Sequence, residues 1–226
     1  MVIHLLTQRF FTLIFWILSK FWFRLEVHGA EHLKGLNGPL VMVANHKSYI
    51  DAFLVFAAIP SWWRSPILPV RAMGNDGFFK NPFMRLLMHA LGSYPSYRGQ
   101  GLDISLKKPL EILKKDGVVG IYPEGKRIIN EEIGFFKRGV GELARRAPGI
   151  SILPISIHGP DGSILQVLPR PFKTIRINFG RPYIPNPSQS SETIAALLRD
   201  RIIFLYHSPH ESLRIGEERV GHPSRT

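Results

Sequence analysis

After Gly29 the sequence alternates short apolar runs with segments of helical pattern, and this alternation constrains the fold more than any other feature. The run Leu40–Ala44 (LVMVA) contains no polar residue, which is typical of a strand that is buried on both faces. The same reasoning predicts strands at Ile67–Val70, Val118–Tyr122, Ile152–Ile157 and Lys173–Phe179, and helices at Ser48–Ala58, Asn81–Leu91, Gly101–Lys115, Gly139–Arg146 and Ser191–Leu205. This order predicts an α/β fold in which helices cover a sheet.

The N-terminus is strongly apolar. The run Phe10–Leu18 (FFTLIFWIL) is followed by Lys20 and Arg24 before it reaches the roughly 20 apolar residues of a simple transmembrane span. No small-residue cleavage site follows the run, which disfavours a signal peptide. We expect a helix that lies in the membrane interface, with Trp16 and Trp22 near the headgroups. The alternative is a core helix of the domain.

The length of 226 residues allows one sizeable core and is short for two. We therefore expect a hydrophobic membrane-associating segment at residues 1–26 and one folded domain at residues 27–206. Residues 207–226 are polar and lack periodicity, so we expect a flexible tail there.

The chain is basic, with 29 Lys and Arg against 17 Asp and Glu and a net charge of +12. Such a surface attracts anionic membranes, phosphorylated ligands or nucleic acid, and charge alone does not choose among them. The sequence has no recognition helix or RNA-binding signature, so we expect an anionic membrane surface and no nucleic acid. The absence of cysteine excludes disulfides, thiolate catalysis and cysteine-bound metals.

The segment Asn45–Asp51 (NHKSYID) follows a predicted strand, where α/β proteins gather catalytic groups. His46 and Asp51 are five residues apart, so they can meet only if a turn separates them and Asp51 lies in the first turn of the next helix. A carboxylate bonded to one imidazole nitrogen would let the other nitrogen take a proton from a hydroxyl. The alternative is a capping box between Ser48 and Asp51, with His46 as a packed loop residue.

A second polar loop, Tyr122–Arg127 (YPEGKR), follows another predicted strand. Glu124, Lys126 and Arg127 place one acid and two cations close together, and adjacent cations can bind a phosphate. The stretch Gly120–Lys126 also matches most of a nucleotide-binding P-loop. However, Arg127 stands where a magnesium-binding Ser or Thr is required, so nucleotide hydrolysis is disfavoured.

Two further segments carry weaker signals. Gly92–Gly99 (GSYPSYRG) contains Arg98, whose guanidinium suits bidentate phosphate binding; the alternative is a surface arginine. The run Ile152–Ile155 is apolar but contains Pro154, which predicts an edge or bulge position because proline cannot donate to a β-ladder.

These four segments, in this order and at this spacing, resemble the glycerolipid acyltransferase family, specifically the 1-acylglycerol-3-phosphate acyltransferases. The family motifs are N-H-x-x-x-x-D, a segment that ends in arginine, F-P-E-G-T-R and a V-P-V-like strand. The matching residues are Asn45, His46 and Asp51; Gly92 and Arg98; Pro123, Glu124, Gly125 and Arg127; and Leu153, Pro154 and Ile155. Phe136–Gly139 also resembles the family's F-K-x-G stretch. The resemblance covers roughly residues 27–185 and implies an α/β fold with a mixed sheet flanked by helices.

The resemblance implies direct transfer of a fatty-acyl group from acyl-CoA or acyl carrier protein to lysophosphatidic acid, giving phosphatidic acid, with no cofactor and no metal. His46 would be the general base and Asp51 would orient it. The implied substrate-binding residues are Arg98, Glu124, Gly125, Lys126 and Arg127. Backbone N–H groups near His46 or near Pro154 are the expected donors to the oxyanion.

Two positions depart from the family pattern: Tyr122 replaces Phe, and Lys126 replaces Thr. We expect Lys126 to bind the acceptor headgroup, with an ion pair to Glu124 as the alternative. The departure leaves open another lysolipid acceptor, such as a lyso-aminolipid. A third reading is a basic peripheral membrane-binding protein with a degenerate site. We expect membrane association at the cytoplasmic face of the inner or plasma membrane.

Overall fold

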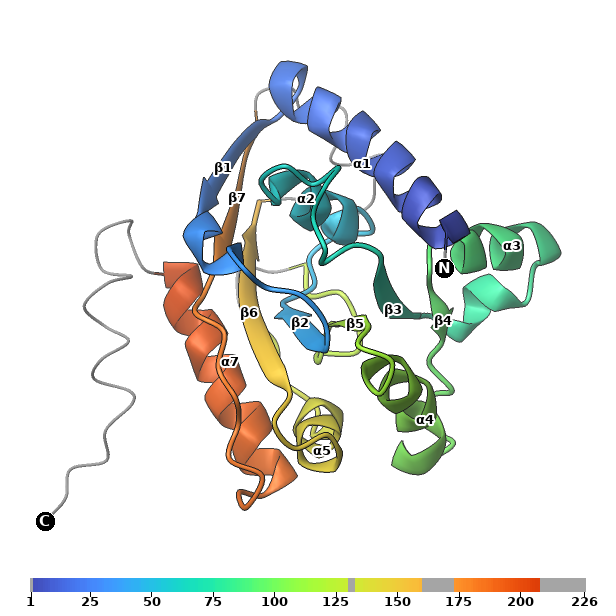
Figure 1. Cartoon of the computed structure of the whole chain (residues 1–226), viewed down its shortest axis with the longest axis vertical. Coiled ribbons are helices and arrows are strands. Elements are labelled where there is room, and N and C mark those ends of the chain that lie inside the picture. Colours follow the sequence, from blue (N-terminus) through green and yellow to red (C-terminus); the bar gives the residue numbers. More distant parts are fainter. Residues whose placement is uncertain (1, 130–132, 160–172, 208–226) are drawn as a thin grey trace, which may run out of the picture.

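The computed structural model describes residues 2–129, 133–159 and 173–207, which form a seven-stranded sheet flanked by helices (Figure 1). The strand order is β1-β7-β6-β2-β5-β3-β4, and β6 with β7 is the antiparallel pair in an otherwise parallel sheet. The strands are β1 Arg24–His28, β2 Leu40–Ala44, β3 Val70–Gly74, β4 Tyr94–Pro95, β5 Val118–Ile121, β6 Ser151–His158 and β7 Thr174–Phe179. The helices are α1 Val2–Phe21, η1 Ala30–Leu33, α2 Asp51–Ala58, η2 Asp76–Phe79, α3 Pro82–Ala90, α4 Leu102–Leu113, α5 Gly139–Arg146 and α7 Ser191–His207. The predicted mixed α/β sheet is confirmed.

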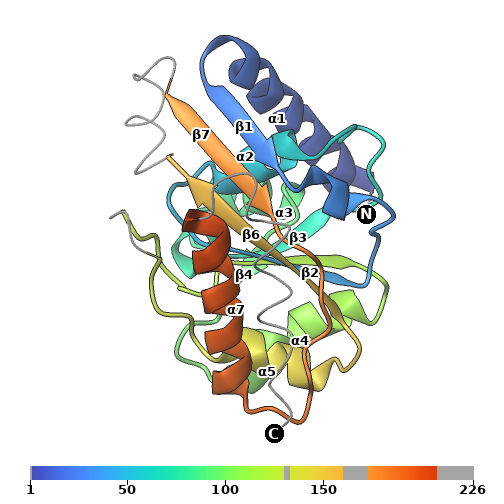
Figure 2. The same cartoon turned by 90° about the vertical axis from the view of Figure 1, so that its left-hand side faces the viewer.

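The position of β2 in the middle of the sheet explains why this strand has no polar residue. Leu40, Met42 and Ala44 face a core that the sheet shares with α1 and α2. Val41 and Val43 face a second core, which α4, α5 and α7 close on the opposite side of the sheet. Figure 2 shows α1 and α2 on one side of the strands and α4, α5 and α7 on the other. The burial of both faces follows directly from the position of β2 between β5 and β6.

Three strands differ from the sequence prediction. The strand predicted at Ile67–Val70 is β3, which begins only at Val70 because Pro69 has no N–H to offer a ladder. β1 was not predicted, since its charged residues suit an edge strand that pairs with β7 alone. The two-residue β4 is too short to leave a pattern. The predicted domain boundary at residues 26 and 27 falls inside β1.

Pro154 is not at a sheet edge, because β6 lies between β7 and β2. It lies at an irregularity in the pairing, as the bulge alternative predicts. Ile152 pairs with Tyr183, and Ile155 pairs with Phe179, so three steps along β6 match four steps along the partner segment. The proline therefore occupies the place where the regular ladder is already interrupted.

Two helices, α3 and α4, can be compared with the helix ends that the sequence predicts. α3 begins with Pro82 and ends just before Gly92, whose φ of +82° favours glycine, as the sequence indicates. α4 contains Pro109 and continues through it as one helix. The tail predicted for residues 207–226 lies outside the described residues except for His207, which ends α7.

The N-terminal helix α1 packs against the domain along one face. Gln8, Thr12 and Phe15 are buried, and the Phe15 ring stacks on Phe53 of α2 with 5.0 Å between centroids. The Gln8 amide accepts from the backbone N–H of Val70 at 2.9 Å and donates to the carbonyl of the same residue at 2.5 Å. Because backbone groups of the sheet depend on this side chain, α1 is fixed in position relative to β3.

His158, the last residue of β6, is a titratable group held within the fold. Its ring stacks on Tyr206 of α7 at 3.5 Å between centroids, and its Nε2 atom is buried without a hydrogen-bond partner. Burial, followed by the nearby charge of Arg176, lowers the pKa of His158 to about 4.

This depressed pKa predicts acid sensitivity. Unfolded His158 takes up a proton near pH 6.5, whereas the folded residue stays neutral until about pH 4. Stability is therefore complete above pH 6.5 and falls as the pH drops toward 4, by about 1–2 kcal/mol after allowance for partial exposure. His158→Phe, which keeps the stacking, should flatten this dependence in urea unfolding of the detergent-solubilised protein. The exposed His89→Gln should leave the pH dependence of stability unchanged. If the free energy of unfolding of wild type and of His158→Phe falls equally with pH, His158 is not the group responsible.

Candidate active site

The Asp51 carboxylate is buried under the loop that follows β2, and it accepts four hydrogen bonds. Its Oδ2 accepts from Nδ1 of His46 at 2.8 Å and from the backbone N–H groups of Lys47 at 2.7 Å and Ser48 at 2.9 Å. Its Oδ1 accepts from the Ser48 hydroxyl at 2.6 Å. A turn separates His46 from Asp51, as the spacing predicts, and α2 begins at Asp51 rather than at Ser48.

Asp51 makes two kinds of contact with the same oxygen. It accepts from the Ser48 N–H, as an acid does in a capping box, although α2 begins only at Asp51, and it accepts from the His46 imidazole. The carboxylate therefore shapes the turn and orients His46 at once.

His46 is positioned to act as a base. With Nδ1 donating to Asp51, Nε2 carries the lone pair, and the side chain is 23% exposed. The Tyr122 ring stacks on the imidazole with 4.2 Å between centroids and 18° between planes. Burial, followed by the charge of Asp51, raises the pKa of Tyr122, so this phenol stays neutral.

Glu124 holds the backbone around His46. The carboxylate is buried, and its oxygens accept from the backbone N–H groups of His46 at 2.8 Å and Gly134 at 2.8 Å. Burial raises the pKa of Glu124, while these two N–H groups act in the opposite direction. Glu124 therefore joins the loop that carries His46 to the loop that carries Gly134.

The backbone N–H groups of His46, Lys47 and Ser48 already have acceptors. The His46 N–H donates to Glu124, and the N–H groups of Lys47 and Ser48 donate to Asp51. These three groups are therefore not available to an oxyanion, and the segment near Pro154 stays the other predicted source of donors.

Arg98 is brought to the same loop by two contacts. Its guanidinium donates to the carbonyl oxygen of Gly125 at 2.5 Å, and its backbone N–H donates to Asp76 of η2 at 3.0 Å. Asp76 also accepts from the N–H of Tyr97 at 2.9 Å. Burial alone would raise the pKa of Asp76, but the hydrogen bonds from these N–H groups outweigh burial and lower the pKa, so the carboxylate stays charged. No motif in the sequence marks Asp76.

Arg127 lies flat on an aromatic ring. Its guanidinium carbon is 3.7 Å from the centroid of the Tyr49 ring, and the next N–H along the chain, of Ile128, donates to the His46 carbonyl at 2.8 Å. Stacking occupies the face of the guanidinium and leaves its in-plane N–H groups for an anion. Lys126 is exposed, and the part of the chain that the structure describes contains no ion pair between Lys126 and Glu124.

Gly125 connects the third motif with the F-K-x-G stretch. Its φ is +69°, and an added Cβ would lie 2.8 Å from Nζ of Lys137. Lys137 therefore packs over the loop and adds a cation to those of Arg98, Lys126 and Arg127. This cationic loop is the natural place for a phosphate group.

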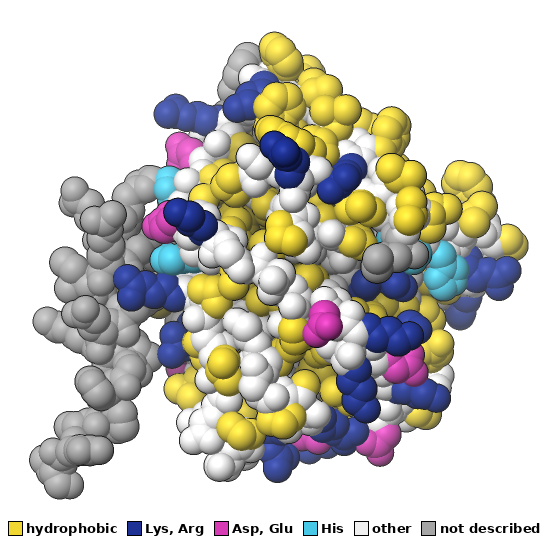
Figure 3. Space-filling model, in the orientation of Figure 1, with side chains coloured by type: hydrophobic (Ala, Val, Ile, Leu, Met, Phe, Trp, Pro, Cys, Tyr) yellow, Lys and Arg dark blue, Asp and Glu magenta, His cyan; other side chains and the backbone are white. Residues whose placement is uncertain are grey.

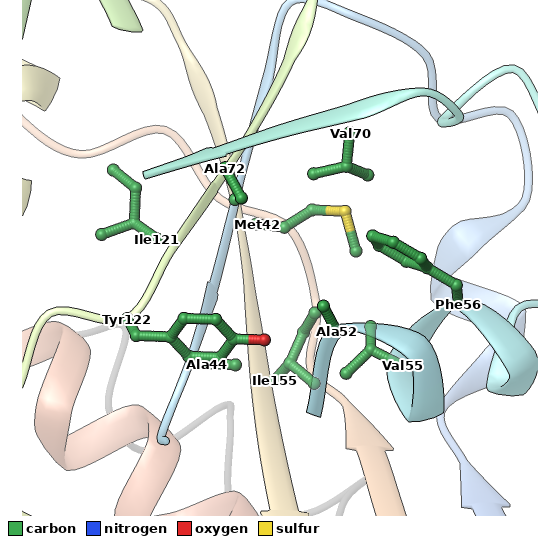
Figure 4. Close-up of a pocket in the computed structure, with 11 residues that line it drawn as sticks. Met42, Ala44, Ala52, Val55, Phe56, Val70, Ala72, Ile121, Tyr122 and Ile155 are labelled. Carbon is green, nitrogen blue, oxygen red and sulfur yellow. The ribbon is translucent and has the colours of Figure 1, made fainter. Parts of the chain in front are cut away.

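An apolar cavity lies between the sheet and α2 (Figure 4). Its volume is about 30 Å³, which is room for a water molecule rather than an acyl chain. The lining residues are Met42, Ala44, Ala52, Val55, Phe56, Val70, Ala72, Gly120, Ile121, Tyr122 and Ile155. Among the described residues, no group of three or more His, Asp or Glu side chains could hold a metal ion.

Comparison with known proteins decides the family. Residues 24–158 match the family model named Acyltransferase, and this range contains all four motifs. The chain belongs to the acyltransferase family. The resemblance that the motifs indicate is therefore confirmed.

The curated relatives include 1-acyl-sn-glycerol-3-phosphate acyltransferases from three kingdoms of life. A chloroplastic enzyme of Arabidopsis thaliana is 27% identical over 61% of this chain and 36% of its own length. The Saccharomyces cerevisiae enzyme is 31% identical over 58% of this chain and 42% of its own length. The Bacillus subtilis enzyme is 25% identical over 60% of this chain and 63% of its own length. The chain thus spans about half the length of the curated relatives it matches.

A solved structure shows the same fold. The 1-acyl-sn-glycerophosphate acyltransferase PlsC of Thermotoga maritima superposes with a TM-score of 0.58 at 18% identity, covering 89% of this acyltransferase chain and 74% of that one. This chain and the Thermotoga maritima protein therefore share the mixed sheet flanked by helices.

The position of Glu124 predicts a stability effect. In Glu124→Gln, the amide nitrogen cannot accept from an N–H, so either His46 or Gly134 keeps a buried donor without a partner. The free energy of unfolding should fall by about 1–3 kcal/mol. The matched control is the exposed Glu111→Gln, whose unfolding curve should stay close to that of the wild type. Equal unfolding curves for the two variants would show that Glu124 does not hold these loops.

Proposed function

We propose that this protein transfers a fatty-acyl group from a thioester donor, acyl-CoA or acyl carrier protein, to the free hydroxyl of lysophosphatidic acid, giving phosphatidic acid for phospholipid synthesis. The observation that carries the proposal is the His46–Asp51 hydrogen bond beside a loop rich in cations. The relatives' names, which specify a 1-acylglycerol-3-phosphate acceptor, support the same acceptor here.

The chemistry follows from the geometry of His46. Nε2 takes the proton of the acceptor hydroxyl as its oxygen attacks the thioester carbonyl. The tetrahedral intermediate collapses, the C–S bond breaks, and the thiolate leaves with the proton that His46 returns. One ester and one thiol are formed, and no covalent acyl-protein is needed. Asp51 fixes the imidazole tautomer and stabilises the imidazolium that exists between the two steps.

The acceptor's phosphate would lie against the cationic loop. Arg98 is oriented by Gly125 and Asp76, and Arg127 is oriented by the Tyr49 ring, so both guanidinium groups are preorganised for an anion. Lys126 makes no ion pair with Glu124, whose oxygens accept from backbone N–H groups. We therefore keep Lys126 as a headgroup-binding residue.

The membrane is the proposed site of action. By length and composition, Val2–Phe21 is the one helix among the described residues that could cross a bilayer, and 17% of its most apolar window is buried. One face of α1 packs on the domain while apolar residues on the other side are exposed, which favours a position in the interface over a span. The charge of +12 suits the anionic, cytoplasmic face of the inner or plasma membrane.

Two alternatives make different predictions for the same site. A lyso-aminolipid acceptor would need no anion-binding loop, whereas Arg98 and Arg127 are both held in place here. A degenerate site in a peripheral membrane protein would not need a partly exposed imidazole that Asp51 orients through Nδ1. The first observation favours a phosphate-bearing acceptor, and the second favours an active enzyme.

The test is acyl transfer by the purified, full-length protein. With palmitoyl-CoA or palmitoyl-acyl carrier protein as donor, we expect lysophosphatidic acid to be acylated in preference to lysophosphatidylcholine, lysophosphatidylethanolamine and a lyso-aminolipid. His46→Ala should lower kcat at least about 100-fold. The matched control is His89→Ala, an exposed histidine outside the site, which should keep wild-type turnover.

Each failure has a distinct meaning. Near wild-type kcat in folded His46→Ala would remove His46 as the base. Preference for any of the other three acceptors over lysophosphatidic acid would refute the assigned substrate. Absence of transfer to every acceptor with both donors would leave a membrane-binding protein.

A further inference from the structure

α3 exposes large apolar side chains although it is a regular, capped helix. Phe83 is 73% exposed and Leu86 is 70% exposed, and no residue of α3 is buried. The Asn81 side chain accepts from the N–H of Met84, so the helix is fixed at its first turn. Phe83 and Leu86 therefore face outward and do not pack in the core.

The exposed side of α3 continues that of α1. The two helices are held together where Gln8 donates to the Leu91 carbonyl at 2.8 Å and where His4 meets the Ala90 carbonyl at 3.3 Å. Figure 3 shows hydrophobic side chains running along the upper and right-hand edge of the molecule, over α1 and α3. The exposed apolar residues of the α1–α3 face are Val2, Ile3, Leu6, Phe10, Leu13, Ile14, Ile17, Phe21, Phe83 and Leu86.

The charges around the α1–α3 face indicate what covers it. Neither α1 nor α3 contains an acidic residue. Exposed cations lie beside both helices: Arg24 follows α1, Lys80 precedes α3, and Arg85 lies within α3. An apolar face without acids and with flanking cations is complementary to a bilayer with anionic headgroups.

We propose that α3 is a second membrane-docking helix, which contacts the same leaflet as α1 and places Arg98 and Arg127 at the level of the lipid headgroups. The docking stands on the α1–α3 face alone, whereas the role of the two arginines rests on the proposed function.

The segment before α3 connects docking to the site. Asp76 of η2 accepts from the backbone N–H groups of Tyr97 and Arg98. Phe78 of η2 meets the Tyr49 ring edge-on at 6.1 Å, and Tyr49 carries Arg127 on its face. Movement of α3 would therefore shift both Arg98 and Arg127. When α3 is bound to the bilayer, the two guanidinium groups are held at the depth of the phosphate of an embedded lysolipid. The acceptor would then reach His46 from the membrane rather than from solution.

A single fluorescent label tests the docking directly. Because the chain has no cysteine, Leu86→Cys can carry a polarity-sensitive fluorophore at one position. With vesicles of equal parts phosphatidylcholine and phosphatidylglycerol, the label should shift to the blue and become accessible to a lipid-bound quencher. The control is labelled Ile184→Cys, at a position that is 62% exposed and follows Tyr183, the bridge partner of Ile152, and its emission should not change. No response at Leu86 while the protein sediments with the vesicles would overturn the proposal and leave a protein partner for this face.

Substitutions provide the energetic test. Phe83→Ser with Leu86→Ser should weaken vesicle partitioning at least about tenfold, since two large apolar side chains leave the bilayer. Ile184→Ser with Leu197→Ser, two exposed positions away from the α1–α3 face, is the matched control and should partition as wild type does. Equal partitioning of both double variants would also overturn the proposal. Should the first double variant fail to fold, the labelled protein still gives the answer.

Acyl transfer separates docking from the proposed function. The ratio of turnover on lysophosphatidic acid in vesicles to turnover on the same lipid in detergent micelles should fall at least about tenfold in the Phe83→Ser, Leu86→Ser variant. An unchanged ratio would contradict delivery of the acceptor through α3. If wild type turns over neither form, the proposed function fails, while the label and the partitioning still decide the docking.

Discussion

A buried carboxylate loses most of its hydration, and Asp51 replaces that hydration with four hydrogen bonds from a stretch of only three residues. These four hydrogen bonds to Asp51 fix the turn between β2 and α2, and they restrict the orientation of His46. The carboxylate is therefore a structural requirement of the loop before it is a catalytic one. For this reason the imidazole can be preorganised without any contact from a substrate.

The sheet supplies the remaining parts because parallel strands end at a common edge. β2 and β5 are neighbours, with Val43 opposite Ile121, so the loops that follow them begin side by side. Glu124 and Tyr122 then hold His46 from the second loop, one through its backbone and one through its ring. β3 and β4 continue the same edge and bring in Arg98 through Asp76 and Gly125. Residues from three separate motifs thus meet at one place.

The parts of the site that the sequence predicts are those encoded locally. The His46–Asp51 contact follows from a spacing of five residues and a strand that precedes it, and Gly92 and Pro82 mark the ends of α3 by their backbone preferences. The roles of Asp76, Tyr49 and Glu124 depend on contacts between distant segments, which no local pattern records. The motif predicts Glu124 but not its hydrogen bonds to the N–H groups of His46 and Gly134, since a motif identifies a residue and not the group it contacts. The start of β3 is missed because Pro69 removes a donor from an otherwise apolar run, and the exposure of Phe83 depends on what packs against α3.

The central claim is that Asp51 holds the Nδ1–H tautomer of His46 and so leaves Nε2 as the base. Nitrogen-15 NMR of the histidine-labelled, detergent-solubilised protein at a pH where the imidazole is neutral measures this directly, with the His46 signal identified by its loss in His46→Gln. The account predicts a protonated Nδ1 and a bare Nε2 in wild type, and a mixture of tautomers in Asp51→Leu, which removes the acceptor. A wild-type His46 protonated at Nε2 would contradict the account, because the nitrogen that faces the acceptor would then have no lone pair to offer.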